Sequence, residues 1–299
     1  MTKKPSISII IPTYNREEVL VDTIKNVLSL KGDFELLVID QTTRHNRTTE
    51  DYLRTHKVNK KIRYFRVSPP SLTLARNFAI KKARADIVCF IDDDVILSQN
   101  FIREHVNTHR QKPDVAVVAG RVEQDGFPTS GAILKFNELG ISEGVFSTGE
   151  DGYTNSFPGG NNSIKKHIFK HAGTFDTNFH KNAFREESEF ANRIVKSGYK
   201  IYYNHKASLL HLRAPYGGCR TPQKDQQDNP DFYANELYFT IKTVRLSMLP
   251  KALFVKFRSY CIVGKKKTVY RWALFLYGLL TAIKRSFFRS QLTAKEVSK

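Results

Sequence analysis

The sequence has few cysteines and no long uninterrupted apolar run. Its three cysteines, Cys89, Cys219 and Cys261, are odd in number and widely spaced. They support neither a disulfide framework nor a cysteine-based zinc site, and they predict a reducing compartment. The first apolar run stops at Pro12 and is too short for the hydrophobic core of a secretory signal, so we expect no such signal.

Two common nucleotide-binding motifs are also missing. No G-x-G-x-x-G follows the first apolar run, and no Walker A sequence occurs anywhere in the chain. A dinucleotide dehydrogenase and a P-loop NTPase are therefore both disfavoured. If a nucleotide binds, we expect acidic side chains and a cation to hold it rather than a glycine-rich loop.

Acidic residues are nearly absent from the C-terminal part of the chain. Residues 237–299 hold 14 of the 48 Lys and Arg residues and one acid, Glu296, so they carry most of the net charge of +19. A helix is expected around residues 272–283, with one basic or small stripe and a broad surface of Leu, Phe, Tyr, Trp and Ile. The stripe contains Lys267, Arg271, Gly278, Thr281, Arg285 and Arg289. This pattern is typical of a helix that lies in a membrane interface.

Residues 237–261 have a similar composition, with Pro250 between two helical stretches. We therefore predict peripheral membrane contact through residues 237–289. Packing of these helices on the body of the protein, or on a second copy, is the first alternative. Nucleic-acid binding by the basic tail is the second. The rest of the chain gives no reason for it, so we expect no nucleic-acid partner.

The N-terminal part alternates between apolar runs and helical patterns. Strands are expected at 6–11, 34–39, 62–67 and 86–91, and helices at 17–30, 48–56 and 73–84. This alternation predicts an α/β protein whose parallel sheet is covered by helices on both faces. Ligands bind beyond the carboxyl ends of the strands in such sheets. Polar residues follow three of the expected strands, at 12–15, 40–42 and 92–94.

Three adjacent aspartates, Asp92, Asp93 and Asp94, leave the last of these strands. Their carboxylates repel one another, and a divalent cation is the partner expected to offset that repulsion. Oxygen ligands suit Mg²⁺ or Mn²⁺, which commonly also hold substrate phosphates. Side chains alternate along an extended segment, so Asp92 and Asp94 point the same way. One of them can then meet a sugar hydroxyl and the other the metal. The alternative is that the three aspartates form only a solvated turn.

Six groups of short segments follow one another over about residues 6–212. They are 8–15 (SIIIPTYN), 37–40 (LVID), 74–77 (LARN) with 87–94 (IVCFIDDD), 157–163 (FPGGNNS) with 173–176 (GTFD), 184–187 (FREE) with Arg193, and 207–211 (ASLLH). In order and spacing they resemble the family 2 nucleotide-sugar glycosyltransferases. The resemblance implies the GT-A fold, a Rossmann-like and mostly parallel sheet with helices on both faces, in residues 1–215. Residues 216–299 are then a basic, helical C-terminal appendage.

The resemblance also implies roles for the matching residues. The residues expected to bind the nucleotide sugar are Pro12, Thr13, Tyr14, Asp40, Arg76, Asp92 and Asp93. Asp94 and His211 are expected on the metal, Mn²⁺ or Mg²⁺, with a backbone hydrogen bond as the alternative for His211. Asn161 and Asn162 match a loop near the transferred sugar or the acceptor, with a simple turn as the alternative.

The catalytic base is expected in the Glu186-Glu187 pair, where the family usually has Glu-Asp. The base takes the proton from an acceptor hydroxyl as its oxygen attacks the anomeric carbon. Glu187 occupies the aligned Asp position and is the first choice. Glu186 is the second, because the register across the pair can shift by one, and Glu189 is a weaker third. A helix with acids only as caps is the alternative.

Together these expectations describe a metal-dependent, inverting glycosyltransferase. Its donor is a nucleoside-diphosphate sugar, and its acceptor is a glycan or lipid-linked saccharide in cell-surface polysaccharide synthesis. Its expected location is cytoplasmic, at the inner face of the cell membrane. A non-catalytic protein of the same fold, which binds nucleotide sugars or glycans, is the main alternative.

Overall fold

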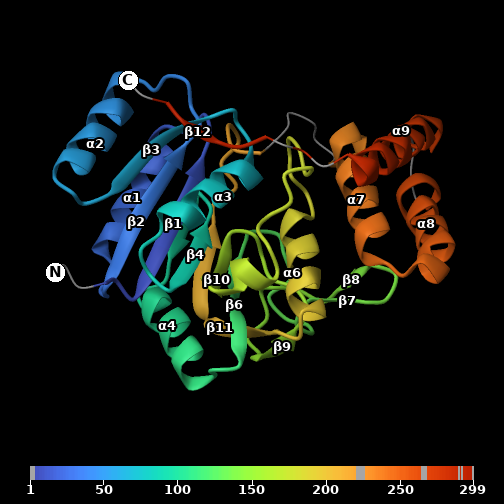
Figure 1. The fold of residues 1–299 in the computed structure, drawn as a ribbon, viewed down its shortest axis with the longest axis horizontal. Coiled ribbons are helices and arrows are strands. Elements are labelled where there is room, and N and C mark those ends of the chain that lie inside the picture. The colour runs from blue at the N-terminus through green and yellow to red at the C-terminus, as the bar shows by residue number, and fades with distance from the viewer. Residues whose placement is uncertain (1–3, 220–225, 264–267, 289, 291, 298–299) are drawn as a thin grey trace.

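A central sheet forms the framework of the protein (Figure 1). The computed structural model describes residues 4–219, 226–263, 268–288, 290 and 292–297. The strands of the sheet are β1 (Ile7–Thr13), β2 (Phe34–Asp40), β3 (Arg63–Ser68), β4 (Ile87–Ile91), β5 (Val95–Leu97), β6 (Val115–Glu123), β9 (Gly152–Thr154), β10 (Asn161–Lys165), β11 (Lys200–His211) and β12 (Lys295–Glu296). A separate small hairpin consists of β7 (Lys135–Phe136) and β8 (Ser142–Glu143).

The strand order confirms the expected α/β sheet. Along the sheet the order is β12-β3-β2-β1-β4-β10-β6-β11-β5, and β9 pairs with β11. The pairs β3–β2, β2–β1, β1–β4 and β6–β11 are parallel. β10 lies between β4 and β6 and is antiparallel to both. This inserted strand carries residues 161–165 into the middle of the sheet, next to the end of β4.

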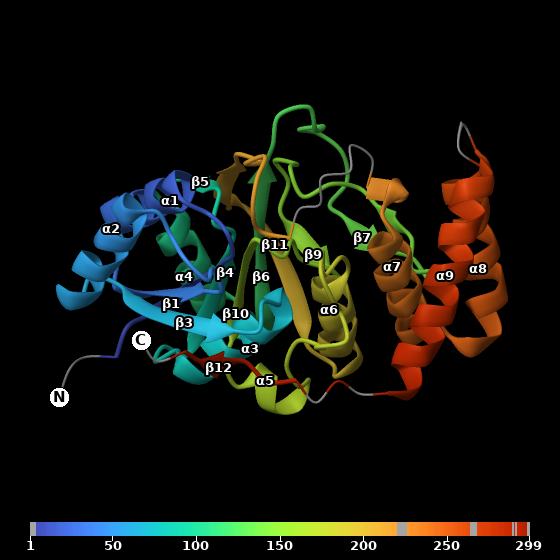
Figure 2. The same cartoon turned by 90° about the horizontal axis from the view of Figure 1, so that it is seen from above.

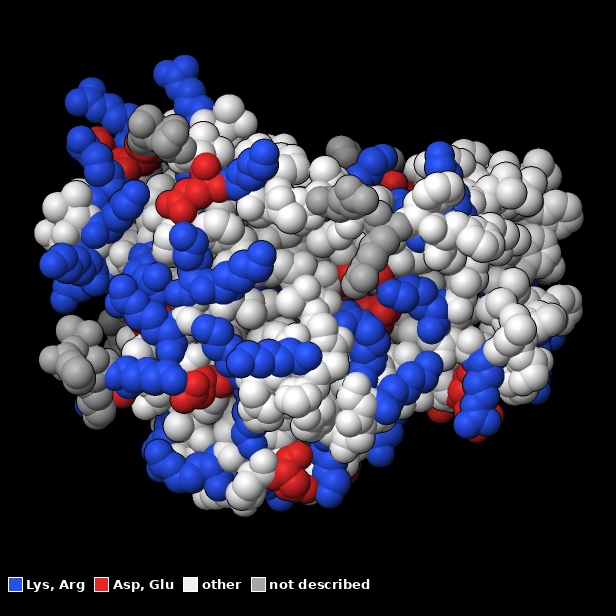
Figure 3. Space-filling view, viewed as in Figure 1, with Lys and Arg blue, Asp and Glu red and all other residues white. Residues whose placement is uncertain are grey.

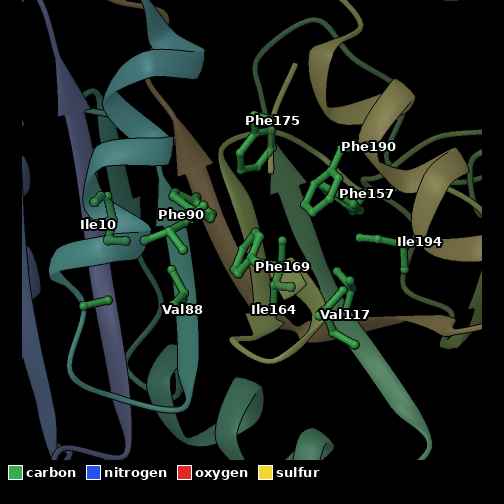
Figure 4. Close-up of a cluster of buried hydrophobic side chains, with 14 of the residues drawn as sticks. Ile10, Val88, Phe90, Val117, Phe157, Ile164, Phe169, Phe175, Phe190 and Ile194 are labelled. Carbon is green, nitrogen blue, oxygen red and sulfur yellow. The ribbon is translucent and has the colours of Figure 1, made fainter. Parts of the chain in front are cut away.

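Side chains that alternate along the strands build two hydrophobic cores, one on each face of the sheet. Ile9 and Ile11 pack with α1 (Glu18–Ser29), α2 (Arg47–Val58) and α4 (Phe101–Gln111). Ile10 faces the other side, where α3 (Leu72–Lys82), α5 (Ile168–His171) and α6 (Glu186–Lys196) cover the sheet. Figure 4 shows part of this second core, in which Phe90 lies near Ile10 and Val88, and Phe157 and Phe190 lie near Ile194 of α6.

β1 continues past the residue that was expected to end it. Pro12 pairs with Ile39, and Thr13 pairs with Asp40. On the other side of β1, the pairing with β4 ends at Ile10. Pro12 lacks an N–H donor and can remain in a strand where one side has no ladder to join. The strand thereby delivers Thr13 to the carboxyl edge of the sheet.

The C-terminal region is helical, as expected, and packs on the body of the protein (Figure 1). Its helices are α7 (Pro230–Thr243), α8 (Leu249–Phe257) and α9 (Thr268–Phe287), with short turns η1 (Gln226–Asp228), η2 (Leu246–Met248) and η3 (Arg258–Ile262). A third core joins α7 and α9 to Phe179 and Ala183 of the preceding region. Pro250 lies in the first turn of α8, where its missing N–H is tolerated.

The predicted basic stripe of α9 faces inward rather than outward. Arg271 is 5 % exposed, and its guanidinium bonds Asp228 and Gln227. Arg285 donates to Asn235 of α7 over 2.7 Å. Lys267 and Arg289, the ends of the predicted stripe, lie outside the described residues. Within the described residues, no helix combines the length and the apolar character that crossing a membrane requires.

The chain returns from α9 to the far end of the sheet (Figure 2). There β12 pairs antiparallel with β3, with Lys295 opposite Ser68 and Glu296 opposite Val67. The Glu296 carboxylate also lies 3.3 Å from Lys82 Nζ. The outer side of β3 is therefore covered by the C-terminal segment.

The contact between α7 and α9 predicts an unusual response to an alanine substitution. Gly→Ala in a helix normally stabilises by about 1 kcal/mol. At Gly278, however, an added Cβ would lie 2.5 Å from Tyr233 Cβ and 2.8 Å from the Tyr233 backbone. Overpacking of this kind costs about 1–3 kcal/mol. We therefore expect Gly278→Ala to lower the thermal unfolding midpoint, measured by differential scanning calorimetry.

Gly149→Ala is the matched control, because an added Cβ there meets no atom within 4 Å. We expect its midpoint to equal that of the wild type. A Gly278→Ala protein as stable as the control would contradict the close packing of α7 on α9.

Candidate active site and metal centre

The polar ends of β1, β2 and β4 lie together at the carboxyl edge of the sheet. The register sets Thr13 of β1 beside Asp40 of β2. The Thr13 hydroxyl donates a hydrogen bond of 2.7 Å to Asp93, which follows β4. The parallel order of these strands thus gathers the polar segments that the sequence places after each of them.

Arg16, which was not among the predicted residues, balances part of the charge of the aspartates. Its Nε lies 3.1 Å from Asp93 Oδ1, and its Nη2 lies 3.2 Å from Asp94 Oδ2. Its Nη1 donates to the carbonyl oxygens of Ala214 and Tyr216. All three charged side chains are buried, where an unpaired charge would be strongly destabilising. The repulsion that we assigned to a cation is therefore offset in part within the chain.

Asp93 points into the protein, although the resemblance implied a donor contact. It is 5 % exposed, and Thr13 and Arg16 bond its two oxygens. Burial raises its pKa to about 7 against the opposing effects of Arg16 and Thr13, while the charges of Asp94 and Asp92 add to the rise. Asp93 therefore anchors the end of β4, and its contact with the donor stays a prediction.

Asp92, Asp94 and His211 form a candidate metal centre. One ligand atom of each lies within 4.8 Å of the others. His211 Nε2 is 3.2 Å from Asp94 Oδ1 and 3.9 Å from Asp92 Oδ2. Two carboxylates and an imidazole suit Mn²⁺ or Mg²⁺, because both cations accept oxygen ligands and Mn²⁺ also accepts nitrogen. The residues present therefore fit the cation that the resemblance implies.

Strand pairing and one glutamine orient His211. The residue ends β11 and pairs with Val95, which follows Asp94 directly. Its Nδ1 lies 2.8 Å from Gln124 Oε1, so Nε2 faces the aspartates. A partner on the outer ring nitrogen is a usual feature of metal-binding histidines. Burial tends to raise the pKa of Asp94, but bonding to His211 and the charges of His211 and Arg16 hold it below its ordinary value.

A tight turn presses against Asp92. A Cβ placed on Gly160 would lie only 2.0 Å from Asp92 Oδ2, so any larger residue there would displace the Asp92 carboxylate. The side-chain amide of Asn162 holds the turn by donating to Pro158 and Gly159 carbonyl oxygens, over 2.8 and 3.0 Å. Asn162 thus sets the position of the turn beside the metal centre.

Asn161 and Asn162 are fully buried. The Asn161 amide donates to the carbonyl oxygens of Arg121 and Ala207, over 2.8 and 2.9 Å, and so joins β10 to β6 and β11. Its Oδ1 lies 3.0 Å from His105 Nε2. The two asparagines shape the loop near Asp92, and a direct contact with the sugar or the acceptor stays a prediction.

Arg76 connects the metal centre to the start of α6. Its Nη1 forms a buried ion pair with Glu186, and its Nη2 donates to Gly159 O over 2.9 Å. The guanidinium carbon lies 5.6 and 5.2 Å from the ring centroids of Phe90 and Phe175. Arg76 is therefore a buried residue of α3, and its contact with the nucleotide stays a prediction.

Burial lowers the pKa of Arg76, whereas the charges of Asp92 and Glu187 oppose that change. Both carboxylates are therefore near its guanidinium.

The three glutamates at the start of α6 have different surroundings. Glu186 is buried against Arg76, and Glu189 is buried against Arg193 and Lys242. Glu187 is partly exposed, and its Oε1 accepts a hydrogen bond of 2.8 Å from Ser188. These surroundings favour Glu187 over the other two as a base that can reach a substrate hydroxyl.

A cavity of about 260 Å³ lies beside the strand ends. Three residues predicted to bind the donor, Pro12, Thr13 and Tyr14, line it together with Gln41. Its other lining residues are Pro70, Ser71, Leu72, Lys181, Asn182, Gly218 and Cys219. Lys181 and Asn182 were not predicted, since they come from a loop whose sequence carries no recognisable motif.

Asp40 belongs to a buried cluster at the end of β2. Its Oδ2 accepts hydrogen bonds from His45 Nε2 and the Tyr64 hydroxyl, over 2.8 and 2.5 Å. Its Oδ1 accepts the Thr42 N–H over 2.8 Å. Within the described part of the chain these partners already engage both oxygens, so the predicted contact of Asp40 with the nucleotide sugar stays a prediction.

A family model described as Glycosyl transferase family 2 matches residues 8–172. The chain is 25 % identical over 234 residues to glucosyl-dolichyl phosphate glucuronosyltransferase of Haloferax volcanii. The matched region covers 70 % of each protein. It is 27 % identical over 133 residues to a poly(ribitol-phosphate) beta-N-acetylglucosaminyltransferase of Staphylococcus aureus, covering 43 % of this chain and 41 % of that protein. The chain spans less than half the length of most curated relatives that it matches.

Solved structures show the same fold. The crystal structure of GalNAc-T7 with UDP, GalNAc and Mn²⁺ superposes with a TM-score of 0.65 at 14 % identity. The superposition covers 96 % of this chain and 58 % of that one. At this identity the likeness establishes the architecture, which is GT-A.

The cluster around Asp40 predicts a pH-dependent stability. Burial opposes a charged His45, but the hydrogen bond and charge of Asp40, with the charge of Glu17, raise the His45 pKa above its ordinary value. The resulting stabilisation is fully present below the unfolded pKa of about 6.5 and is lost as pH rises through the higher folded pKa. We expect the thermal unfolding midpoint of His45→Gln to fall less than that of the wild type as the pH rises above about 6.5.

His171→Gln changes an exposed histidine of α5 and is the control. Its midpoint should follow the wild-type curve across the same pH range. If His45→Gln also followed that curve, the pair with Asp40 would not be a source of the pH dependence.

Proposed function

Because the chain belongs to glycosyl transferase family 2 and has the GT-A fold, we propose that it is a metal-dependent, inverting glycosyltransferase that uses a nucleoside-diphosphate sugar. The acceptor is a hydroxyl of a glycan or lipid-linked saccharide in cell-surface polysaccharide synthesis. One observation carries the proposal: Asp92, Asp94 and His211 converge within 4.8 Å, at the strand ends that border the cavity lined by Thr13 and Tyr14.

The proposed cation is Mn²⁺ or Mg²⁺, held by Asp92, Asp94 and His211. When bound, it supplies positive charge that stabilises the negative charge of the departing diphosphate. The presence of UDP and Mn²⁺ in the GalNAc-T7 structure supports this choice. Arg16 and Gln124 are not proposed as ligands: Arg16 balances the inner carboxylates, and Gln124 orients the His211 ring.

Glu187 is the proposed base. It takes the proton of the acceptor hydroxyl, whose oxygen forms a bond to the anomeric carbon of the donor sugar. The bond from that carbon to the diphosphate oxygen breaks, and the nucleoside diphosphate leaves with the electron pair. Attack from the face opposite the leaving group inverts the anomeric centre, so one base suffices.

The donor is proposed to occupy the cavity formed by Pro12, Thr13 and Tyr14. Asp92, whose side chain is 40 % exposed, is proposed to meet the ribose and the cation. Arg76 lies between this carboxylate and α6, and we assign it the position facing the nucleotide. The pair with Glu186 then fixes its guanidinium before the donor arrives.

The acceptor is proposed to be reached at the inner face of the cell membrane, with the protein on the cytoplasmic side. Two observations support this. The basic residues 237–289 predict an attraction to anionic lipid. The relative from Haloferax volcanii is named for glucosyl-dolichyl phosphate, which is a lipid-linked saccharide.

Replacing the proposed base tests the mechanism. We expect Glu187→Gln to reduce transfer by about 10²–10⁴-fold, because the amide cannot accept the hydroxyl proton. Nucleoside diphosphate binding should stay unchanged. The measurement is release of nucleoside diphosphate from a panel of nucleotide sugars with Mn²⁺, together with calorimetric titration of UDP and GDP.

Glu150→Gln, at an exposed position, is the control and should be fully active. Glu186→Gln should lower the thermal midpoint, because it weakens the buried pair with Arg76. Normal turnover of Glu187→Gln, or a loss of transfer confined to Glu186→Gln, would move the base assignment to Glu186.

Replacing a metal ligand tests the donor site separately. We expect Asp94→Asn to weaken Mn²⁺-dependent binding of UDP or GDP by at least about tenfold, since a charged ligand is lost. Isothermal titration with and without Mn²⁺ measures the effect. Asp86→Asn, which changes an exposed carboxylate before β4, should bind as the wild type does. Equal Mn²⁺-dependent affinity of Asp94→Asn and the wild type would exclude Asp94 as a ligand.

A further inference from the structure

The two faces of α9 have different partners. Its inner face carries Arg271, Phe275, Gly278 and Ala282, which are buried. At Gly278 the backbone approaches Tyr233 of α7 closely. Arg271, Gly278 and Ala282 are thus used for packing within the protein, and the other side of the helix is left exposed.

The outer face of α9 is apolar. Leu276, Leu280, Ile283 and Phe287 recur at spacings of four, three and four residues, so they lie on one side of the helix. They are 58, 60, 42 and 80 % exposed. Exposed apolar patches of this kind mark surfaces that meet another apolar phase or partner.

Aromatic and basic side chains are exposed on α9 and on the neighbouring segment 249–258. Trp272 and Tyr277 of α9 are 46 and 50 % exposed. On α8, exposed Phe254 has Lys251 three residues before it and Arg258 four residues after it, which places both on its side of the helix. Figure 3 shows mostly uncharged atoms over this end of the molecule, with a few basic side chains among them.

We propose that the outer face of α9, with Phe254 of α8, docks onto the interface of a membrane that contains anionic lipids. An amphipathic helix binds such an interface through its buried apolar side and through basic residues that meet the lipid headgroups. Trp and Tyr rings suit this boundary, because each has an apolar body and a polar group. Lys284 follows Leu280 by four residues and precedes Phe287 by three, so it flanks the same row.

Charge decides between a membrane and a second copy of the chain. The regular spacing of the row would also suit packing against another helix. However, residues 237–295 contain no acid, and the charged residues of α9 on the exposed side, such as Lys284, are basic. Two copies joined at this face would bring like charges together, whereas anionic headgroups complement them.

The inner side of α9, opposite the docking face, is connected to the proposed donor cavity by hydrogen bonds. Arg285 donates to Asn235 Oδ1 over 2.7 Å, and Asn235 Nδ2 lies 2.6 Å from Asn182 Oδ1. Asn182 lines the cavity. A protein docked through α9 therefore holds its donor site at a fixed orientation to the lipid surface. The inference rests on the membrane contact included in the proposed function and names the surface that makes it.

Flotation with lipid vesicles tests the surface on the full chain. The probes are vesicles of phosphatidylcholine with about one quarter phosphatidylglycerol, and vesicles of phosphatidylcholine alone. We expect the wild type to float with the anionic vesicles and to bind the neutral ones less. The double variant Leu276→Ser/Leu280→Ser should bind the anionic vesicles at least about tenfold more weakly than the wild type, because it removes two apolar side chains from the face.

Val58→Ser/Val195→Ser is the matched control, since it removes two exposed apolar side chains outside α8 and α9. It should float as the wild type does, and equal thermal midpoints would show that both double variants are folded. If the α9 variant floated like the control, α9 would not be the docking face, although membrane contact would stand.

A wild type that bound no vesicles would overturn the docking proposal and the membrane contact together. If light scattering then gave a dimer that the α9 variant converts to a monomer, the face would be an interface between two copies. Flotation needs neither donor nor Mn²⁺, so either result would leave the proposed sugar transfer untouched.

Discussion

The pairing of Arg16 with Asp93 and Asp94 is the interaction on which the rest of the site depends. Two adjacent carboxylates, those of Asp93 and Asp94, cannot be buried together without a positive partner, and Arg16 supplies one from the loop after β1. Its bonds to Ala214 and Tyr216 bring the segment after β11 to the same place. One guanidinium therefore ties three chain segments together, and it leaves Asp92 and Asp94 directed toward His211.

Much of this framework could be predicted from the sequence, because it follows from local periodicity. The apolar runs gave the four parallel strands, and the polar residues after them indicated the edge where they meet. The direction of individual side chains could not be predicted in the same way. Asp93 looks like its neighbours in the sequence, and only the approach of Thr13 and Arg16 shows that it is internal. The available signal for the role of Arg16 was its position, because it is a basic residue only four positions after Pro12.

The C-terminal helices show a second limit of sequence reasoning. Helical spacing separates the basic stripe of α9 from its apolar side, but it does not say which side packs on α7. Gly278 was the available signal, since a glycine within a helix often marks a close approach of another backbone. The buried contacts of Arg271 and Arg285 lie far apart in sequence from most of their partners, and no local pattern reports them.

The return of the chain from α9 to β12 affects how the protein can be handled. An uncovered edge strand presents unpaired N–H and C=O groups that can recruit a strand of another molecule. β12 occupies that position on β3 with only two paired residues. A purification tag or a truncation near Lys295 therefore affects the pairing of β12 with β3, at the end of the sheet far from α9. A chain shortened before β12 would leave the edge of β3 open to strand addition from another molecule and to aggregation.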